Sequence, residues 1–386
     1  MSDNFLPFSK PTISEEAIAE VTECLRSGWI TTGPRVEKLS TLLREYLNSP
    51  HAILLTSATA GMHLTLLALN LQPEDEVITA SMTFISTPNM IVQAGGKPVF
   101  VDINRQTLNM EIADIEKAIT PNTRAIIPVH FAGLPMDLDP LYALAKKHGL
   151  RVIEDAAHAI GAYYKEKIIG SFGDIQIFSF HPNKNMTTGE GGCITIRDEE
   201  LATQIRLMAF HGMDRAAWNR YAKTGKQDYE IIAPGFKYNM MDIQAAIGLH
   251  QVPHLKEFNE KRRRLAERYV EQLQGWPELE LPKMPPYQAL HAWHIFTPLL
   301  NIEKIGMDRA HFMSLLKEHN IGSGVHYKAA HLYPYYQNNY PVAPGKLINT
   351  EYVSERIVSL PLFPTMTFED QDRVIGAMRT IFNSAT

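Results

Sequence analysis

The chain has 386 residues, of which 45% are hydrophobic and 20% are charged, a balance typical of a folded globular protein. Its formal net charge of −5 argues against a general nucleic-acid partner. The two cysteines, Cys24 and Cys193, are too few for a disulfide framework and lack metal-ligand spacing. We therefore expect reduced thiols, no bound metal and a cytoplasmic setting.

The length exceeds the roughly 250–300 residues at which a single core stops growing, so we expect two domains. We place a large domain at residues 1–250. Residues 251–386 form a long linking helix and a small C-terminal domain. The start of the chain, Met1–Phe5, shows no secretory signal, and no uncharged apolar stretch is long enough to predict a membrane span.

The first predicted element is a helix. Thr12–Glu15 reads as a capping box, and Ile18, Val21 and Leu25 then fall on one helical face. Gly28 is expected to end this helix, and a loop with Trp29 and Thr31 follows.

From about residue 52, short apolar runs alternate with helical stretches, which predicts an α/β fold with a mainly parallel sheet and helices on both faces. The expected helices include Gly61–Leu69, Ile112–Ile119 and Leu138–His148. The expected strands are Ala52–Leu55, Glu76–Thr79, Pro98–Asp102, Ala125–Val129, Arg151–Glu154, Ile175–Phe180 and Cys193–Ile196.

The last third of the chain predicts a long helix over Met241–Gln274 and then a proline-rich connector. A small α+β domain would follow, with strands at His294–Leu300 and Ile321–Tyr327 and a helix at Asp308–Asn320. The basic run Lys261–Arg264 is interpreted as a solvated helix face, because glutamates lie nearby.

Lys184 and Asp155 each follow an apolar strand, and ligands of such sheets bind outside the carboxyl ends of the strands. A lysine amine forms a Schiff base with the aldehyde of pyridoxal 5′-phosphate (PLP), and a carboxylate keeps the pyridine nitrogen protonated. The pair indicates PLP chemistry, with Lys184 and Asp155 as catalytic residues. The alternatives are a surface lysine and an aspartate that caps a helix beginning at Ala156.

Other strand ends supply candidate cofactor contacts. Ser57–Gly61 is a small-residue turn into a helix, whose free amides favour a phosphate, although an ordinary capped helix would look the same. Ser179 is a further phosphate candidate. Phe84 is placed to stack on the cofactor, and His158 to contact its ring or orient Asp155, but both residues could simply pack.

Several motifs together carry a resemblance to a known family. The chain is similar, over essentially its whole length, to the DegT/DnrJ/EryC1/StrS nucleotide-sugar aminotransferases, which are fold-type I PLP enzymes. The motifs are Gly28–Pro34, Ser57–Gly61, Glu154–Ala159, Phe178–Lys184 with Gly189–Gly192, and Tyr238–Met240.

The resemblance implies a role for each matching residue. Lys184 matches the Schiff-base lysine and Asp155 the partner of the pyridine nitrogen. Ala58, Thr59 and Ser179 match phosphate-binding positions, Phe84 the stacking aromatic and His158 a ring contact. Asn239 matches a residue that reaches the cofactor phosphate of the other subunit, which implies a homodimer with shared active sites.

Residues 291–294 and 323–331 resemble the enzymes that form UDP-4-amino-4-deoxy-L-arabinose, a route of lipid A or surface polysaccharide modification. That resemblance implies transamination of a UDP-linked 4-keto pentose, with glutamate as donor. Its alternative is a dTDP-, UDP- or GDP-linked 4-keto-6-deoxyhexose. Substrate contacts are expected from Trp29, Thr31, His326, Tyr327 and His331.

Three rival functions remain open from the sequence. One is a different PLP reaction, such as dehydration. Another is a dinucleotide-dependent oxidoreductase, against which the missing glycine fingerprint counts. The third is a binding protein that has lost activity, against which the intact pair Lys184 and Asp155 counts.

Overall fold

A computed structural model describes residues 5–213 and 229–385, and most of the expected signal-free segment Met1–Phe5 lies outside them. Seven strands form a central sheet in the order β1-β9-β8-β5-β4-β2-β3. They are β1 (His51–Leu55), β2 (Glu76–Ala80), β3 (Lys97–Val101), β4 (Thr123–Ile127), β5 (Arg151–Asp155), β8 (Ile175–Ser179) and β9 (Gly192–Ile196).

Only β9 runs against its neighbours in this sheet. It pairs antiparallel with β1 and with β8, whereas the other neighbouring strands pair in parallel. The mainly parallel α/β sheet predicted from the sequence is therefore confirmed, and each predicted strand lies within two residues of its observed position.

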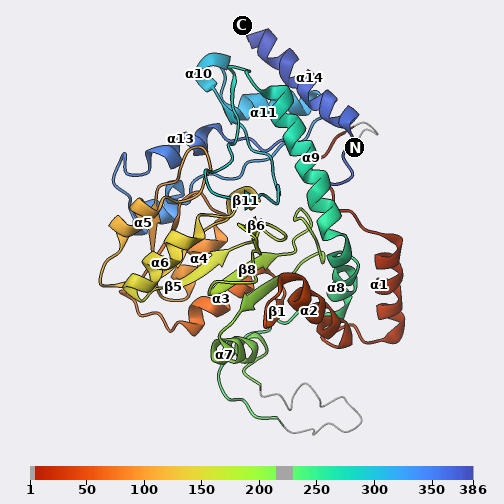
Figure 1. Cartoon of the computed structure of the whole chain (residues 1–386), viewed down its shortest axis with the longest axis vertical. Coiled ribbons are helices and arrows are strands. Elements are labelled where there is room, and N and C mark those ends of the chain that lie inside the picture. Colours follow the sequence, from red (N-terminus) through yellow and green to blue (C-terminus); the bar gives the residue numbers. More distant parts are fainter. Residues whose placement is uncertain (1–4, 214–228, 386) are drawn as a thin grey trace.

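Helices cover both faces of the sheet (Figure 1). One face packs against α3, α4 and α7, and the other against α2, α5 and α6. These helices are α2 (Pro34–Leu47), α3 (Ala58–Ala68), α4 (Ser86–Gln93), α5 (Ile112–Ala118), α6 (Leu138–His148) and α7 (Glu199–Ala209).

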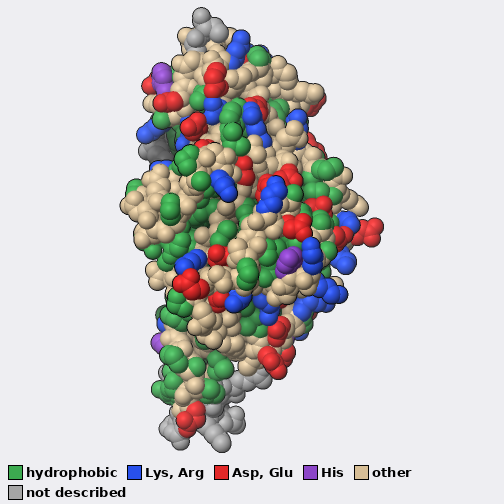
Figure 2. Space-filling view, turned by 90° about the vertical axis from the view of Figure 1, so that its left-hand side faces the viewer, with side chains coloured by type: hydrophobic (Ala, Val, Ile, Leu, Met, Phe, Trp, Pro, Cys, Tyr) green, Lys and Arg blue, Asp and Glu red, His purple; other side chains and the backbone are tan. Residues whose placement is uncertain are grey.

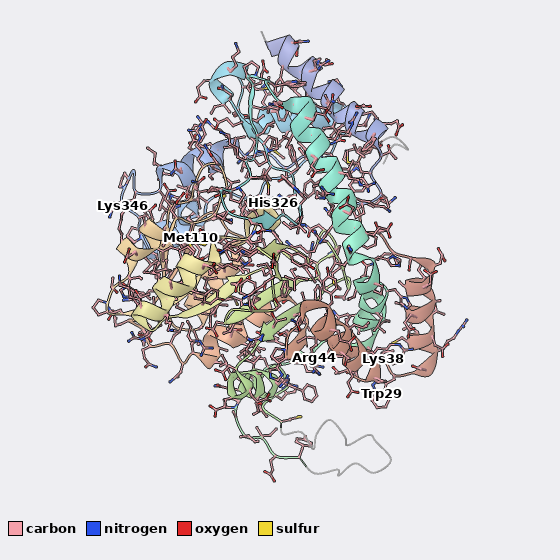
Figure 3. All side chains as sticks on the ribbon, in the orientation of Figure 1. Trp29, Lys38, Arg44, Met110, His326 and Lys346 are labelled. Carbon is pink, nitrogen blue, oxygen red and sulfur yellow. The ribbon has the colours of Figure 1, made fainter. Side chains whose placement is uncertain are left out.

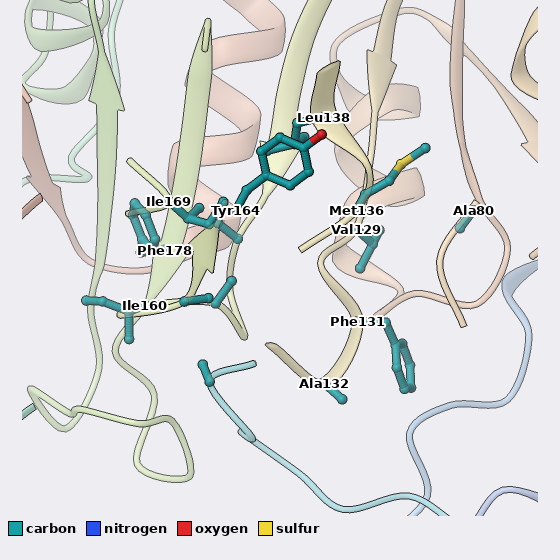
Figure 4. Packing of buried hydrophobic residues seen from close by; sticks show 14 of the residues in the cluster. Ala80, Val129, Phe131, Ala132, Met136, Leu138, Ile160, Tyr164, Ile169 and Phe178 are labelled. Carbon is teal, nitrogen blue, oxygen red and sulfur yellow. The ribbon is translucent and has the colours of Figure 1, made fainter. Parts of the chain in front are cut away.

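The two faces explain why the strands read as continuous apolar runs. Within β1, Ile53 and Leu55 join the core under α3, and Ala52 and Leu54 join the opposite core. Figure 4 shows part of that second core, where Tyr164 lies close to Leu138 of α6. Each buried leucine there contributes about 1.5–3 kcal/mol through removal of its apolar surface from water.

α1 (Glu15–Ser27) begins two residues later than the capping box suggested. Ser14, rather than Thr12, is the N-cap, and its Oγ accepts a 3.3 Å hydrogen bond from Ala17 N. Gly28 ends the helix with a φ of 73°, as expected for a left-handed C-cap.

The predicted helix over Met241–Gln274 is interrupted. The structure has α8 (Asp242–Leu249), a short 3₁₀ turn at Val252–His254, and α9 (Leu255–Leu273). Pro253 lies in that turn and has no backbone N–H to continue a helix. α9 then rises out of the sheet region toward the last part of the chain (Figure 1).

The C-terminal part packs around α9 and has a separate core. Its helices are α10 (Ile302–Ile305), α11 (Arg309–Glu318), α12 (Pro334–Asn339), α13 (Ile348–Arg356) and α14 (Phe368–Ala385). Most of its predicted strands are wrong. Of residues 294–300 only β12 (Leu299–Leu300) is a strand, and residues 321–327 make only isolated bridges at Ile321 and Gly324.

The remaining short strands form two small sheets. β10 (Leu279–Glu280) pairs with β12, while β11 (Ala289–Leu290) pairs with β6 (Tyr163–Tyr164), which pairs with β7 (Lys167–Ile168). The N-terminal segment also reaches the C-terminal part, because Leu6 bridges Ile321 and belongs to the core around α9.

The surface carries both signs of charge close together. On the face drawn in Figure 2, acidic and basic side chains are interspersed. Ion pairs such as Lys147 with Glu116, at 2.8 Å, are part of this pattern. No helix within residues 5–213 and 229–385 is both long and apolar enough to cross a membrane.

Candidate active site

A cavity of ≈ 280 Å³ opens at the carboxyl edge of the sheet, where β5 ends at Asp155 and β8 ends at Ser179. Asp155 is paired in register with Ile177, so the two strand ends are adjacent. The cavity is lined by Ser57, Ala58, Thr59, Met62, Thr83, Phe84, Ser86, Val129, Asp155, Ala157, His158, Ile177, Ser179, His181, Asn183, Lys184, Glu190, His326 and Tyr327.

Lys184 is half-buried on a tight loop that follows β8. Its backbone N–H donates to His181 O at 2.9 Å, and Thr188 N donates back to Phe180 O at 3.1 Å. Burial is the main cause that lowers the pKa of Lys184 to about 8; Asp155 acts in the opposite direction, and the charge of Arg262 acts in the same direction as burial. With that pKa, roughly a tenth of Lys184 is a neutral, nucleophilic amine at pH 7, and about half is neutral at pH 8.

Asp155 is held by two hydrogen bonds. Thr87 Oγ1 donates to Oδ2 at 2.7 Å, and Ala157 N donates to Oδ1 at 3.2 Å. No α-helix begins after Asp155, where the chain makes a turn instead. The helix-cap alternative is thereby excluded, and the carboxylate lies on the wall of the cavity with a fixed orientation.

His158 lies beside Asp155 in the chain and is buried. Its Nε2 is 3.0 Å from Tyr327 Oη, and its Nδ1 is buried without a partner in the part of the chain that the structure describes. Burial first, and then the charge of Lys184, hold the pKa of His158 well below its usual range. The imidazole is therefore neutral. Phe84 is 55% exposed and lies with its ring centroid 5.9 Å from that of Tyr327.

The N-terminus of α3 also lines the cavity, through Ser57, Ala58 and Thr59, and is called the phosphate end below. Ser57 caps this helix, with Ala60 N donating to its Oγ at 3.0 Å, and Ser86 Oγ donates to Thr59 Oγ1 at 2.8 Å. The first-turn amides and the helix dipole favour an anion there. Gly192 allows β9 to pack closely against the first turn of α3, since a Cβ at this position would lie 2.4 Å from Ala58 N.

Four of the expected site residues lie outside the cavity of their own chain. Trp29 Nε1 donates to Thr32 O, and Thr31 O accepts from Asp242 N. Figure 3 shows Trp29 at the edge of the molecule, well separated from His326 near its centre. Asn239 is buried; its Oδ1 accepts from Lys237 Nζ at 2.7 Å and its Nδ2 donates to Thr32 Oγ1.

His331, the fourth, is a buried residue of the C-terminal part. Its Nδ1 is 2.7 Å from Ser81 Oγ, and its Nε2 is 3.5 Å from a carboxylate oxygen of Glu351. Tyr327 and His326 do reach the cavity. Burial lowers the pKa of His326 to about 4, so it faces the cavity as a neutral group whose Nδ1 lies 2.7 Å from Ser359 Oγ.

Sequence reasoning missed three residues of this region. Thr87, which holds Asp155, lies in α4, and its hydroxyl is also 3.2 Å from that of Thr83; no local sequence signal indicated its contact with Asp155. His294 lies 3.5 Å from the Lys184 amine, on a segment predicted to be a strand. Arg262 was assigned to a solvated face but is buried and donates to His294 O and Leu362 O.

The described residues fit PLP. The N-terminus of α3, against which Gly192 packs, suits a phosphate. Asp155 suits a pyridine nitrogen, and the Lys184 amine suits an aldehyde. No cluster of three metal-ligating side chains occurs in residues 5–213 and 229–385.

The chain is similar to known proteins over nearly its whole length. The DegT/DnrJ/EryC1/StrS aminotransferase family model matches residues 11–379. The spore coat polysaccharide biosynthesis protein SpsC of Bacillus subtilis is 44% identical over 384 residues, covering 99% of this chain and 98% of that protein.

Solved structures are also similar. Spr1654 from Streptococcus pneumoniae, assigned as a sugar aminotransferase and solved in its PLP form, aligns with a TM-score of 0.90 and 32% identity, covering 99% of this chain and 100% of that one. Helicobacter pylori PseC, an aminotransferase involved in the biosynthesis of pseudoaminic acid, aligns with a TM-score of 0.90 and 28% identity, covering 99% and 100%. The chain belongs to the DegT/DnrJ/EryC1/StrS aminotransferase family and is a PLP-dependent sugar aminotransferase.

Proposed function

We propose that this chain transfers an amino group to the C4 ketone of a nucleotide-linked sugar, with Lys184 and Asp155 as its catalytic residues. The observation that carries the proposal is that these two residues and the N-terminus of α3 line one cavity. PLP, when bound, supplies an electron sink for the charge that develops at the reacting carbon.

The lining residues have distinct tasks in this proposal. Ala58, Thr59 and Ser179 would hold the phosphate at the positive end of α3. Asp155 would face the pyridine nitrogen with its negative charge, oriented by Thr87 and Ala157 N. Phe84 and His158 would contact the ring.

Lys184 is the proton carrier. With PLP and an amino donor bound, Lys184 Nζ would accept the proton of the donor α-carbon and deliver it to the cofactor carbon, which is positioned acid–base catalysis. A pKa of about 8 lets the same amine take and give a proton near neutral pH. The reverse sequence at the sugar ketone completes the transfer, and we propose glutamate as donor on the family resemblance alone.

For the sugar, we propose a UDP-linked 4-keto pentose, with formation of UDP-4-amino-4-deoxy-L-arabinose and hence a role in lipid A or other surface polysaccharide modification. The support is the resemblance at residues 291–294 and 323–331, of which His326 and Tyr327 line the cavity. The similarity to SpsC, a spore coat polysaccharide biosynthesis protein, supports the broader surface polysaccharide role.

The alternative is a 4-keto-6-deoxyhexose linked to dTDP, UDP or GDP. One observation favours it: His291 and His331 are buried away from the cavity, so much of the pentose resemblance lies outside the site of this chain. Trp29 and Thr31 likewise could touch a sugar only if their loop borders a partner's cavity.

We also propose a homodimer with shared sites. Asn239 lies outside its own cavity, so a role at a cofactor phosphate requires a second subunit. Ile18, Leu25 and Ile30 of the N-terminal region are each about half exposed and could add apolar contacts to such a dimer. A larger hollow of ≈ 530 Å³ adjoins the phosphate end and shares Ser57 and Thr59 with the cavity.

The test offers purified protein, with PLP and glutamate, a panel of UDP-, dTDP- and GDP-linked 4-keto sugars and identifies the amino sugar formed by mass spectrometry. We expect the highest kcat/KM for the UDP-4-keto pentose, by a margin of about 10–200-fold, the usual worth of one methyl group. A clear preference for a 6-deoxyhexose would replace the pentose assignment, and no transamination across the panel would contradict the proposed class. Lys184→Ala protein is the negative control.

A further inference from the structure

A second buried imidazole contacts the catalytic lysine. His294 Nε2 lies 3.5 Å from Lys184 Nζ, and the side chain is 1% exposed. It does not line the cavity and lies behind the lysine, with its ring centroid 4.3 Å from that of His158. The proposed chemistry gives this histidine no task.

The backbone around His294 is pinned from two sides. His294 N donates to Ala132 O at 2.9 Å, and Arg262 Nη1 donates to His294 O at 3.0 Å. The preceding residue, Trp293, has a φ of 46°, which is rare for a bulky side chain and carries strain. A strained residue at this point indicates that the surrounding packing fixes the backbone next to His294.

Burial, more than the neighbouring groups, keeps the ring of His294 neutral. Lys184, His158, Arg262 and His326 face it from four separate segments, and no carboxylate does so among the groups that influence it. Burial first, and then these groups, hold the pKa of His294 well below its usual range. A neutral imidazole has one ring nitrogen that can accept a hydrogen bond, whereas a lysine ammonium can only donate.

We propose that His294 is a positioning residue of this site, which accepts an N–H of Lys184 through Nε2 and holds the amine at the back of the cavity whenever the lysine is not bound to cofactor. The inference rests on the catalytic role proposed for Lys184. What it adds is a hydrogen bond between two protein groups, Lys184 Nζ and His294 Nε2.

The arrangement serves a lysine that must leave and return. Lys184 sits on a flexible four-carbon stem, and a free amine could turn toward Asp155, the opposite charge that also acts on it. An acceptor behind the amine restricts that motion. A neutral acceptor does so without taking the proton that Lys184 must carry.

The test measures the pKa of Lys184 in cofactor-free protein, by competitive acetylation across pH and mass spectrometry of the Lys184 peptide. His294→Phe keeps a ring of similar size but removes the acceptor. We expect it to lower the pKa of Lys184 by about one unit, because a hydrogen bond to the charged amine is lost. His294→Gln, which places an amide oxygen near the Nε2 position, should restore a value close to the parent's.

His291→Asn is the matched control. His291 is a buried neighbour whose Nδ1 accepts from Trp293 N at 2.9 Å, and an asparagine oxygen can keep that bond. This variant should leave the pKa of Lys184 unchanged. If His294→Phe does not fold, His294→Leu takes its place in the comparison with His294→Gln.

An unchanged pKa in the variants without an acceptor would overturn the proposal, as would equal shifts in these variants and in His294→Gln. With cofactor, kcat should fall about tenfold in His294→Phe and recover in His294→Gln, at little change in KM for the donor. A pKa shift without any loss of turnover would support the hydrogen bond but overturn the positioning role of His294. Failure of the catalytic role proposed for Lys184 is observed separately, as turnover that persists in Lys184→Ala.

Discussion

At the scale of single residues, the site depends on how its polar groups are surrounded. Lys184 loses hydration and acquires a pKa of about 8, while Asp155 is fixed by Thr87 and by a backbone amide. His158 and His326 face the same cavity as neutral rings. The cavity therefore offers the Lys184 amine and the oriented carboxylate of Asp155, with Glu190 as a second acidic residue of its lining.

Replacing Asp155 by asparagine tests the carboxylate. Asp155→Asn should still bind PLP but turn over at least about 10²-fold more slowly, because an amide cannot stabilise a protonated pyridine nitrogen. Thr87→Val is the graded control; it keeps the carboxylate and removes one hydrogen bond, which is worth about 1 kcal/mol, so about a fivefold loss is expected. Near-normal turnover in Asp155→Asn would leave the residue with no catalytic task.

The pKa of Lys184 sets the pH dependence of cofactor capture. Because burial lowers this pKa to about 8, the neutral amine grows about tenfold per pH unit below that value and levels off above it. The rate at which cofactor-free protein takes up PLP, followed by absorbance, should show the same plateau. A rate that kept rising toward pH 10.4, roughly the value of an unperturbed lysine, would disprove the lowered pKa.

At the scale of elements, β9 and α3 together build the phosphate end. Gly192 begins β9 opposite the first turn of α3, and it leaves room for the amide of Ala58. This approach requires the glycine for space, since the clash of a Cβ would be with backbone that cannot move aside.

Gly192→Ala should therefore weaken PLP binding by about tenfold or more, since about 1–3 kcal/mol of strain or displaced backbone is expected from such a clash. Equilibrium dialysis measures the loss. Gly376→Ala is the matched control, because a Cβ there would meet nothing within 4 Å and the residue lies within α14. Equal cofactor affinity in both variants would show that α3 does not form the phosphate end.

The sequence was sufficient where local pattern and tertiary role agree. Apolar runs such as residues 175–180 predicted central strands, and their ends located Asp155, Ser179 and Lys184. It failed in the C-terminal part, where the apolar side chains of residues 294–300 are divided between two cores: Phe296 and Leu300 pack in the core around α9, and Ile295 and Leu299 pack in a core of the large sheet. Arg262 was missed because the basic run conceals that one of its side chains is buried, a consequence of tertiary packing alone.

At the scale of the whole molecule, the proposed active site would need both parts of one chain and a residue of a partner subunit. We propose a division of the chain into residues 1–250 and 251–386. The β-bridge between Leu6 and Ile321 links these two parts. The cavity lies at the sheet edge, and His326 and Tyr327 reach it from beyond residue 251. Both parts would therefore be needed to form one site, and Asn239 would belong to the site of a partner.

Mixing two inactive variants tests the shared sites. Lys184→Ala lacks the amine, and Asn239→Asp would set a negative charge against the partner's phosphate. Equal mixing and re-association should restore activity at roughly a quarter of the sites, because one site of each mixed dimer then has neither change. The control is each variant alone. Fully active monomers at micromolar concentration, or no recovery on mixing, would refute the shared site.

The measurement that addresses the central claim most directly is borohydride reduction of the PLP-saturated protein, followed by peptide mass mapping. We expect a yellow protein whose colour is lost on reduction, with the cofactor mass fixed on the peptide that contains Lys184. Lys184→Ala protein should carry no such mass and have no turnover, while its fold is retained, because the change removes one group of the cavity and little core volume. Labelling at another lysine, or none in saturated protein, would contradict the assignment of this site.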